Sequence, residues 1–247
     1  MNQTKLFLIE RLCALFIAAL LMTTGAACGT QVKDTRNGDG TVMTKGEKGG
    51  PVNYVALGDS TGVGVGAREG GYVARLFERI KELRPGSRLT NMCVSGATTE
   101  DVLDEQVRTT ALTSQTTLVT LGIGINDVGR GVSVERFARN YEEIIKRVRA
   151  KTNAPIVLTN LPDVSLAPVV PASLRSELES RITLFNEHIE EIARRHDLRV
   201  VDAYQATHEL IPQHPEFFSS DGFHPSDTGY EYWAKLMWPT IKTAIGE

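Results

Sequence analysis

Cysteine is scarce in this chain of 247 residues, which contains three cysteines. Cys13 and Cys28 belong to an N-terminal segment that differs from the rest of the sequence, so Cys93 stands alone in the main part of the chain. One cysteine cannot build a disulfide framework. The fold therefore has to depend on a hydrophobic core, and a content of 41% hydrophobic residues is ordinary for a globular protein.

An excess of positive charge is also absent. The sequence has 27 Lys and Arg against 30 Asp and Glu, which gives a formal net charge of −3. No basic field is therefore available to hold a nucleic-acid backbone, and we expect no nucleic acid among the partners. Internal repeats and a Walker-type phosphate-binding motif are missing as well.

Long hydrophobic runs are missing except at 13–22, where an apolar stretch follows two basic residues. It is shorter than the ~20 residues of a membrane span, and the small residues after it are typical of an export signal. The segment Gly-Ala-Ala-Cys at 25–28 resembles a bacterial lipoprotein signal, with Gly25 in place of the usual Leu. We therefore expect a signal peptide over 1–27, a lipid on Cys28 and an exported, membrane-anchored lipoprotein. Ordinary cleavage with secretion and an uncleaved anchor are the alternatives.

Residues 28–50 are rich in Gly, Thr, Asp and Lys and contain almost no large apolar side chain. Such a segment cannot bury enough surface to offset the entropy lost on ordering, so its composition predicts a flexible linker. We expect one folded domain over 51–247.

Short apolar runs alternate with segments of helical periodicity throughout that domain. Parallel strands need helical crossovers, so this alternation predicts an α/β fold with a doubly wound, five-stranded parallel sheet and helices on both faces. The expected strands are 52–57, 88–94, 117–123, 155–161 and 198–204, and the expected helices are 71–83, 99–112, 133–150, 172–196 and 226–244.

Small and polar residues follow four of the expected strands, at 58–60, 95–96, 122–127 and Asp163. Ligand sites of doubly wound sheets lie outside the carboxyl ends of the strands. We therefore expect these residues to meet at one edge of the sheet, where a site would be built.

The glycine-rich stretch that follows the first strand, GDSTGVGVG at 58–66, has two interpretations. Gly62, Gly64 and Ala67 match the dinucleotide pattern G-x-G-x-x-G/A, but that site needs an acidic residue after the second strand, and 93–96 contain none. We therefore expect no nucleotide cofactor. In the other interpretation, the glycines let Ser60 approach a substrate as a nucleophile, with helix capping as its structural alternative.

A base for Ser60 is available near the C-terminus, where Asp221 and His224 are three residues apart in a loop. The carboxylate can orient one imidazole nitrogen while the other nitrogen faces the hydroxyl. The N–H groups of Ser60 and Gly96 and the amide of Asn126 are candidate donors to an oxyanion. Taken alone, each residue has a turn or a cap as its alternative. The rival acids and bases are Asp163, Asp202, His188, His196, His208 and His214.

Taken in order, four sequence blocks resemble those of the SGNH (GDSL-type) hydrolase family. The blocks are Gly58-Asp59-Ser60 with Gly64, Gly96, Gly124-x-Asn126-Asp127, and Asp221-x-x-His224-Pro225. The resemblance spans about 52–238. It implies a three-layer α/β/α sandwich of flavodoxin-like type. It assigns a catalytic triad to Ser60, Asp221 and His224, and an oxyanion hole to Ser60, Gly96 and Asn126.

By the same resemblance, the protein is a serine esterase that works through an acyl-enzyme and needs no metal or other cofactor. Short acyl or acetyl esters of small molecules, lipids or sugars are the expected substrates. A different class of function stays open at this point: a surface-tethered, non-catalytic glycan-binding module on a hydrolase fold, because a fold does not by itself imply a function.

Overall fold

The structure, a computed structural model, describes residues 49–108 and 111–247. The expected signal peptide over 1–27, Cys28 and all but the last two residues of the expected linker lie outside these ranges. Within the described ranges, no helix has both the length and the apolar character required to cross a membrane.

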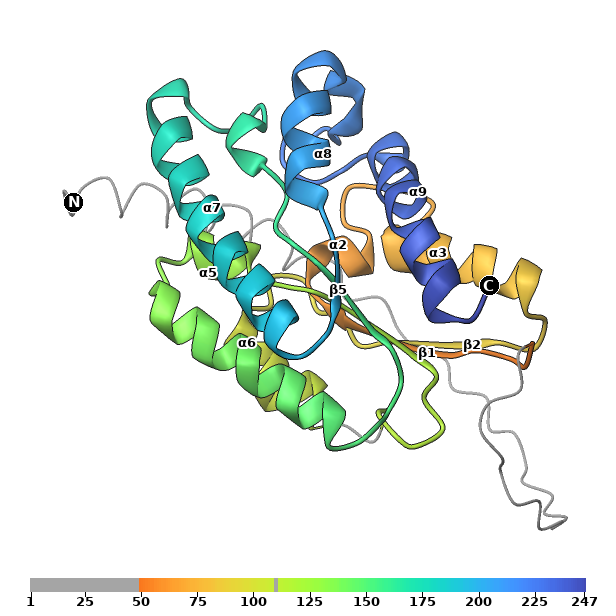
Figure 1. The fold of residues 1–247 in the computed structure, drawn as a ribbon. Helices are drawn as coiled ribbons and strands as arrows, with labels where there is room; N and C mark the ends of the chain where they lie inside the picture. The colour runs from red at the N-terminus through yellow and green to blue at the C-terminus, as the bar shows by residue number, and fades with distance from the viewer. Residues whose placement is uncertain (1–48, 109–110) are drawn as a thin grey trace, which may run out of the picture.

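A parallel sheet of five strands forms the middle layer, in the order β2-β1-β3-β4-β5 (Figure 1). The strand order reverses at β1, because the chain first adds β2 on one side of it and then β3 on the other. Sites in doubly wound sheets form at such a switch point. The strands are β1 (Asn53–Gly58), β2 (Arg88–Asn91), β3 (Leu118–Gly122), β4 (Ile156–Thr159) and β5 (Arg199–Val201).

Helices cover both faces of this sheet, which confirms the expected three-layer α/β/α sandwich (Figure 1). The longer helices are α3 (Tyr72–Leu83), α6 (Val134–Arg149), α7 (Ala172–Arg195), α8 (Ala203–Leu210) and α9 (Asp227–Ala244). The short helices are α2 (Ser60–Val63), α4 (Thr99–Asp101), η1 (Val102–Gln106), α5 (Ile125–Gly129), η2 (Val164–Leu166), η3 (Ile211–Gln213) and η4 (Pro215–Phe217).

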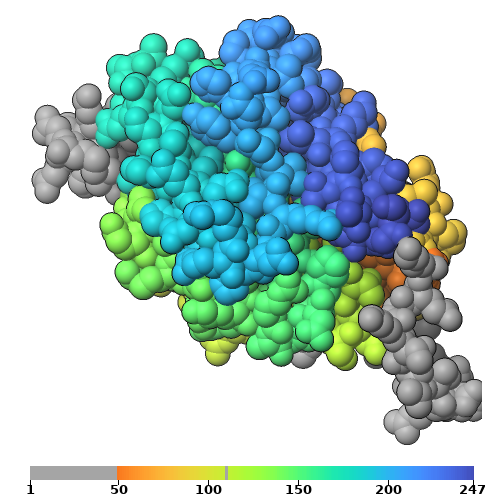
Figure 2. Space-filling view, viewed as in Figure 1, coloured from red at the N-terminus to blue at the C-terminus, as the bar shows by residue number. Residues whose placement is uncertain are grey.

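Two apolar layers hold the sandwich together, one on each face of the sheet. On one face, α6 and α7 pack side by side, and on the other α3 packs against α9. Figure 2 shows that the C-terminal part of the chain, from teal to dark blue, covers much of the visible surface.

Helix α6 illustrates how the sequence produces these layers. The Ser133 hydroxyl accepts a hydrogen bond from the N–H of Arg136 and so caps the first turn. Phe137, Tyr141 and Ile144 recur at helical spacing and are fully buried against the sheet. Basic residues in the last turn complement the negative end of the helix dipole.

Two of the expected strands are shorter than the sequence indicated. Strand β5 ends at Val201 because Asp202 caps a helix, α8, accepting a hydrogen bond of 3.0 Å from the N–H of Gln205. The prediction that the strand continues to residue 204 was wrong, because α8 begins at Ala203. Strand β2 ends at Asn91, whose amide donates to the carbonyl of Gly62 at 2.9 Å and whose side-chain oxygen accepts from the N–H of Cys93 at 3.1 Å.

The helix expected over 99–112 is also different. Thr98 and Asp101 form a capping box that starts α4, but the chain then widens into the π-helix η1 over Val102–Gln106. Segments of π-helix are frequent at functional sites because they turn a side chain out of the ordinary helical register.

Candidate active site

Ser60 lies in the turn that leaves β1. The carboxylate of Asp59 caps α2, accepting hydrogen bonds from the N–H and the hydroxyl of Thr61 at 3.0 and 2.8 Å. Ser60 is the first residue of α2, so its own N–H has no carbonyl partner inside that helix. Asp59, and not Ser60, therefore caps this helix. The hydroxyl of Ser60 is not needed as a cap and faces the site.

The glycines after Ser60 allow close packing rather than an open phosphate cradle. Gly64 has a φ of 97°, in the left-handed region, and a Cβ at this position would lie 2.1 Å from the backbone nitrogen of Gly71. A Cβ on Gly62 would lie 2.3 Å from the Sγ atom of Cys93. Side chains at these positions would push α2, and with it Ser60, away from its support.

The structure brings Ser60, His224 and Asp221 into one chain of hydrogen bonds. The Nε2 atom of His224 lies 3.1 Å from the Oγ atom of Ser60, and its Nδ1 atom lies 2.7 Å from Oδ2 of Asp221. Only 5% of Ser60 is exposed. Residues separated by more than 150 positions in sequence thus meet at the edge of the sheet, with the geometry of an activated nucleophile.

The carboxylate of Asp221 is held in a fixed orientation. Its Oδ1 atom accepts three hydrogen bonds, from the hydroxyl of Ser219 and the N–H groups of Phe223 and His224, at 2.8 to 2.9 Å. Burial raises the pKa of this carboxyl, but the bonds from the His224 ring, the two N–H groups and the hydroxyl lower the pKa below its usual value overall. Asp221 is therefore a carboxylate at neutral pH.

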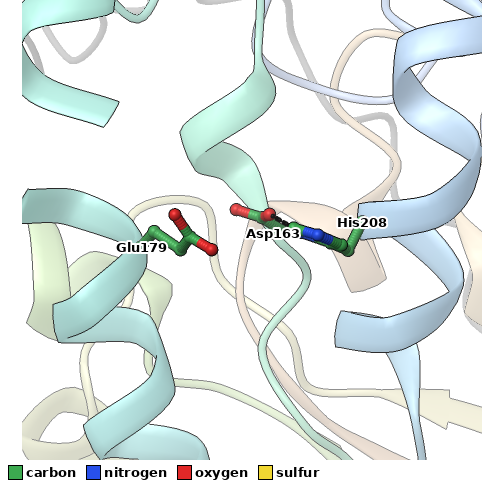
Figure 3. A group of neighbouring side chains, drawn as sticks. All are labelled: Asp163, Glu179 and His208. Atoms are coloured by element: carbon green, nitrogen blue, oxygen red, sulfur yellow. Dashed lines mark hydrogen bonds and ion pairs between the residues drawn. The ribbon is translucent and has the colours of Figure 1, made fainter. Parts of the chain in front are cut away.

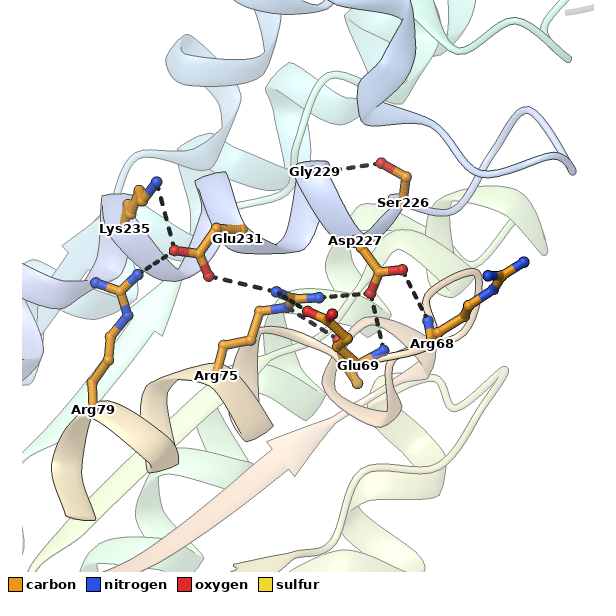
Figure 4. A network of polar contacts seen from close by, with 10 residues as sticks. Arg68, Glu69, Arg75, Arg79, Ser226, Asp227, Gly229, Glu231 and Lys235 are labelled. Carbon is orange, nitrogen blue, oxygen red and sulfur yellow. Dashed lines mark hydrogen bonds and ion pairs between the residues drawn. The ribbon is translucent and has the colours of Figure 1, made fainter. Parts of the chain in front are cut away.

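A polar network anchors the start of α9, directly after the loop that carries Asp221 and His224, to the loop after α2 (Figure 4). Asp227, at the start of α9, accepts hydrogen bonds from the N–H groups of Arg68 and Glu69 and from the Arg75 guanidinium, the last at 2.7 Å. Because Asp227 comes three residues after His224, these bonds fix His224 relative to Ser60. The sequence analysis did not identify Asp227.

The two other expected oxyanion donors lie at the same edge, Gly96 in a turn and Asn126 in the short helix α5. The Nδ2 atom of Asn126, in α5, donates to the carbonyl of Ala97 at 2.9 Å, which ties it to the loop of Gly96. Gly96 has a φ of 78° and its carbonyl accepts from Arg130 at 2.7 Å. The second hydrogen of the Asn126 amide stays available as a donor.

Asp127, the residue after Asn126 in α5, ties this helix to the segment that follows Gly96. Its carboxylate accepts hydrogen bonds from the N–H and the hydroxyl of Thr99, at 2.9 and 2.5 Å. Burial raises the pKa of Asp127 to about 6, and the bonds from Thr99 offset only part of this effect. The raised pKa means that folding favours the protonated form of this carboxyl.

An effect of pH on stability follows from Asp127. Its contribution is fully present below the unfolded pKa of ~3.9 and is lost as the pH rises through the folded pKa, a change of about 3 kcal/mol in unfolding free energy. We expect the stability of the wild type, relative to Asp127→Asn, to fall by this amount between pH 4 and pH 7. Urea unfolding of both proteins across that range measures it, and parallel pH profiles would contradict it.

A second pair of histidine and aspartate is separate from His224 and Asp221 (Figure 3). The Nδ1 atom of His208, on α8, is 2.7 Å from Oδ2 of Asp163, while Oδ1 of Asp163 accepts from Ser165. This bond to the carboxylate raises the pKa of His208. With Glu179, the pair brings three possible metal ligand atoms within 4.8 Å of one another. The imidazole of His208 is thus paired with Asp163 and is not bonded to Ser60.

The other rivals are also engaged elsewhere. His196 contacts Glu142 at 2.8 Å, His214 contacts Glu216 at 2.8 Å and His188 lies 3.8 Å from Glu191. Asp202 caps α8, as described above. Among the histidines of the described ranges, His224 is the one bonded to Ser60.

Gln106 is a supporting residue that the sequence analysis missed. Its side-chain amide makes two hydrogen bonds to Gly58, accepting from the N–H at 2.9 Å and donating to the carbonyl at 2.8 Å. These bonds complete the end of β1, where β2 has stopped pairing, directly before Ser60. Only the π-helix brings this amide inward, and no pattern in the sequence indicates it.

An apolar cavity adjoins Ser60 and His224. It lies between the ends of β3 and β4, helices α8 and α9, and the short helices that join them. Its walls are mainly aliphatic and aromatic side chains, among them Leu161, Val164, Ile211, Phe217, Phe223 and Leu236. A cavity of this kind suits the hydrocarbon part of a substrate.

Comparisons with known proteins agree with this geometry. The spore germination lipase LipC of Bacillus licheniformis is 27% identical over 208 residues, which cover 73% of this chain and 92% of that protein. A GDSL-like esterase of Mycobacterium tuberculosis is 26% identical over 211 residues, covering 79% of this chain and 63% of that protein. The crystal structure of a lipase/acylhydrolase from Enterococcus faecalis has a TM-score of 0.62 at 25% identity, covering 78% of this chain and 96% of the other.

A family model provides the assignment. The model of the GDSL-like lipase/acylhydrolase family matches residues 56–232, a range that contains Ser60, Gly96, Asn126, Asp221 and His224. The resemblance found in the sequence motifs is thereby confirmed. The chain belongs to the GDSL-like lipase/acylhydrolase family and is an ester-hydrolysing enzyme.

Proposed function

We propose that the protein is a serine esterase that hydrolyses carboxyl esters through an acyl-enzyme on Ser60. One observation carries the proposal: the hydroxyl of Ser60 is 3.1 Å from His224, whose other nitrogen is 2.7 Å from Asp221. In this arrangement the imidazole removes the hydroxyl proton, and the carboxylate stabilises the imidazolium that results.

The reaction has two halves. In the first, Oγ of Ser60 bonds to the ester carbonyl carbon while its proton moves to Nε2 of His224. The tetrahedral intermediate then breaks the bond to the alcohol, which leaves with that proton. In the second half, water is deprotonated by the same nitrogen, attacks the acyl-enzyme and releases the acid, and the proton returns to Ser60.

Three donors are proposed for the oxyanion of these intermediates: the N–H groups of Ser60 and Gly96 and the amide of Asn126. The N–H of Ser60 lacks a helical partner, and Asn126 is held at the Gly96 loop by its bond to Ala97. Loss of one such donor typically costs about 3 to 4 kcal/mol of transition-state stabilisation.

The apolar cavity is proposed to hold the acyl chain. Filling it with methylene groups removes apolar surface from water, which is worth about 0.8 kcal/mol per buried methylene. We expect kcat/KM for p-nitrophenyl esters to rise from acetate through butyrate to hexanoate. If acetate is the best of the three, the assignment of the cavity to the acyl chain is wrong, while Ser60-dependent turnover still supports the esterase.

We also propose that the protein is exported and anchored to a membrane by a lipid on Cys28. The proposal rests on the sequence of residues 1–28 alone. The full chain made in a bacterial host should partition into the detergent phase of a detergent extract, whereas Cys28→Ala should stay in the aqueous phase. Identical partitioning of both proteins would refute the lipid anchor: both in the aqueous phase would indicate secretion, and both in the detergent phase would indicate an uncleaved anchor.

A further inference from the structure

Gly96 occupies the third position of a tight turn over 94–97. The N–H of Ala97 donates to the carbonyl of Val94 at 3.1 Å, which closes the turn. Gly96 has a φ of 78°, whereas the φ of Ser95 is not positive. This combination is typical of a type II turn, which differs from a type I turn by a flip of the peptide between its two central residues. The direction of the Gly96 N–H therefore depends on the turn keeping this type.

The N–H of Gly96 is available to an oxyanion. It makes no hydrogen bond within the described ranges, although the N–H groups of Val94 and Ala97 both do. The N–H of Val94 donates to the carbonyl of Gly58 at 3.1 Å, two residues before Ser60. The first residue of the turn is thus fixed at the end of β1, next to the nucleophile.

The end of the turn is held by two side chains of α5. Nη2 of Arg130 donates to the carbonyl of Gly96 at 2.7 Å, and Nδ2 of Asn126 donates to the carbonyl of Ala97 at 2.9 Å. Arg130 is the C-cap of α5, and its own N–H donates to the carbonyl of Asn126 at 2.9 Å. The two side chains therefore act from one rigid element on two consecutive peptide groups.

The charge of Arg130 has no counter-ion within the part of the chain that the structure describes. The exposed Arg136, on α6, pairs with Glu100, but no ion pair joins Arg130 to a carboxylate there. Arg130 is also exposed, so its bond to Gly96 is not needed to compensate a buried charge. Hydrogen bonds from a charged donor are about twice as strong as neutral ones. Such a bond at the residue that carries an oxyanion donor points to a role in the reaction.

We propose that Arg130 is a positioning residue of the oxyanion hole, which holds the carbonyl of Gly96 so that the N–H of Gly96 stays directed at the oxyanion. The inference rests on the proposed esterase function and deepens it. Arg130 acts through Gly96 and does not itself contact the substrate.

The test begins with Arg130→Met, which removes the donor and keeps a side chain of similar length. We expect kcat for p-nitrophenyl butyrate to fall about tenfold or more, the value of a hydrogen bond from a charged donor. KM should stay within about twofold of the wild type, because the oxyanion forms only after the ester has bound. Arg130→Lys keeps a cationic donor and should be several-fold more active than Arg130→Met.

A second measurement isolates the oxyanion. A trifluoromethyl ketone with a butyl chain accepts Oγ of Ser60 at its carbonyl carbon while the hydroxyl proton moves to His224, which leaves an oxyanion in the same site. Its inhibition constant should rise in Arg130→Met by about the factor by which kcat/KM falls. A change confined to folding would instead appear as a lower midpoint of thermal unfolding, which we expect to stay unchanged.

Arg136→Met is the matched control, because Arg136 is also exposed and pairs with Glu100, four residues after Gly96. Its kcat should equal that of the wild type. The inference would be overturned by a kcat of Arg130→Met within twofold of the wild type, by a loss confined to KM, or by Arg130→Lys no more active than Arg130→Met. An equal loss in Arg136→Met would also overturn it. None of these outcomes affects the esterase proposal, which fails only if butyrate turnover does not require Ser60.

Discussion

Replacing Ser60 with Ala should reduce kcat/KM for p-nitrophenyl butyrate by roughly 10⁴- to 10⁶-fold. The substitution removes one oxygen from a residue that is 5% exposed, so the fold should persist. His224 would keep its carboxylate but would have no hydroxyl to deprotonate. Steady-state rates for the purified proteins measure the loss.

Ser180→Ala is a suitable control for that loss. The Ser180 hydroxyl lies on the exposed side of α7 and, within the part of the chain that the structure describes, bonds to the carbonyl of Ser176 at 2.8 Å. Its removal should leave the rate unchanged. If the wild type and Ser60→Ala release p-nitrophenol equally slowly, the protein does not use this serine for catalysis. The non-catalytic glycan-binding module would then be the better interpretation.

The second large effect separates two histidines that look alike. His224 and His208 each place Nδ1 at 2.7 Å from an aspartate oxygen. His224→Gln should lower kcat by roughly 10³- to 10⁴-fold, because no base remains for Ser60. His208→Gln should leave kcat unchanged, because His208 lies on α8 and bonds to Asp163 rather than to the serine.

One result with these two variants would contradict the prediction. A loss of similar size in both would mean that the bond between His208 and Asp163 controls the site through α8, and that proximity to Ser60 is not what distinguishes the base. Circular dichroism and thermal unfolding of the two variants would show whether a loss in either reflects unfolding.

The sequence was most informative where local pattern and tertiary packing agree. The apolar stripes of α6 and α7 and the buried runs of β1 and β3 predicted the sandwich, because burial of one helical face or of a whole strand leaves a periodic signal. Residues that follow strands met at one edge because parallel strands end together. The spacing of Asp221 and His224 fits a single loop, so their contact was also predictable.

The sequence was least informative where one side chain decides the local structure. The apolar run at 198–204 indicated a strand, but Asp202 caps a helix there and β5 stops early. Likewise, nothing in the pattern around Gln106 indicates a π-helix, although its amide completes the end of β1. Such effects depend on hydrogen-bond partners that are distant in sequence.

The cavity was not predictable from the sequence for another reason. Its lining combines Gly122 of β3, Thr159 of β4 and Trp233 of α9. Only the fold brings these residues, which are far apart in the sequence, around one cavity.

Formation of an ester on Ser60 is the central claim, and trapping that ester tests it most directly. The wild type, mixed with p-nitrophenyl hexanoate and quenched in acid within one turnover, should give a peptide containing Ser60 that is heavier by one hexanoyl group. The same peptide from His224→Gln or Ser60→Ala should carry none. Hexanoate released at the wild-type rate with the acyl group on another residue, or on none, would contradict the account.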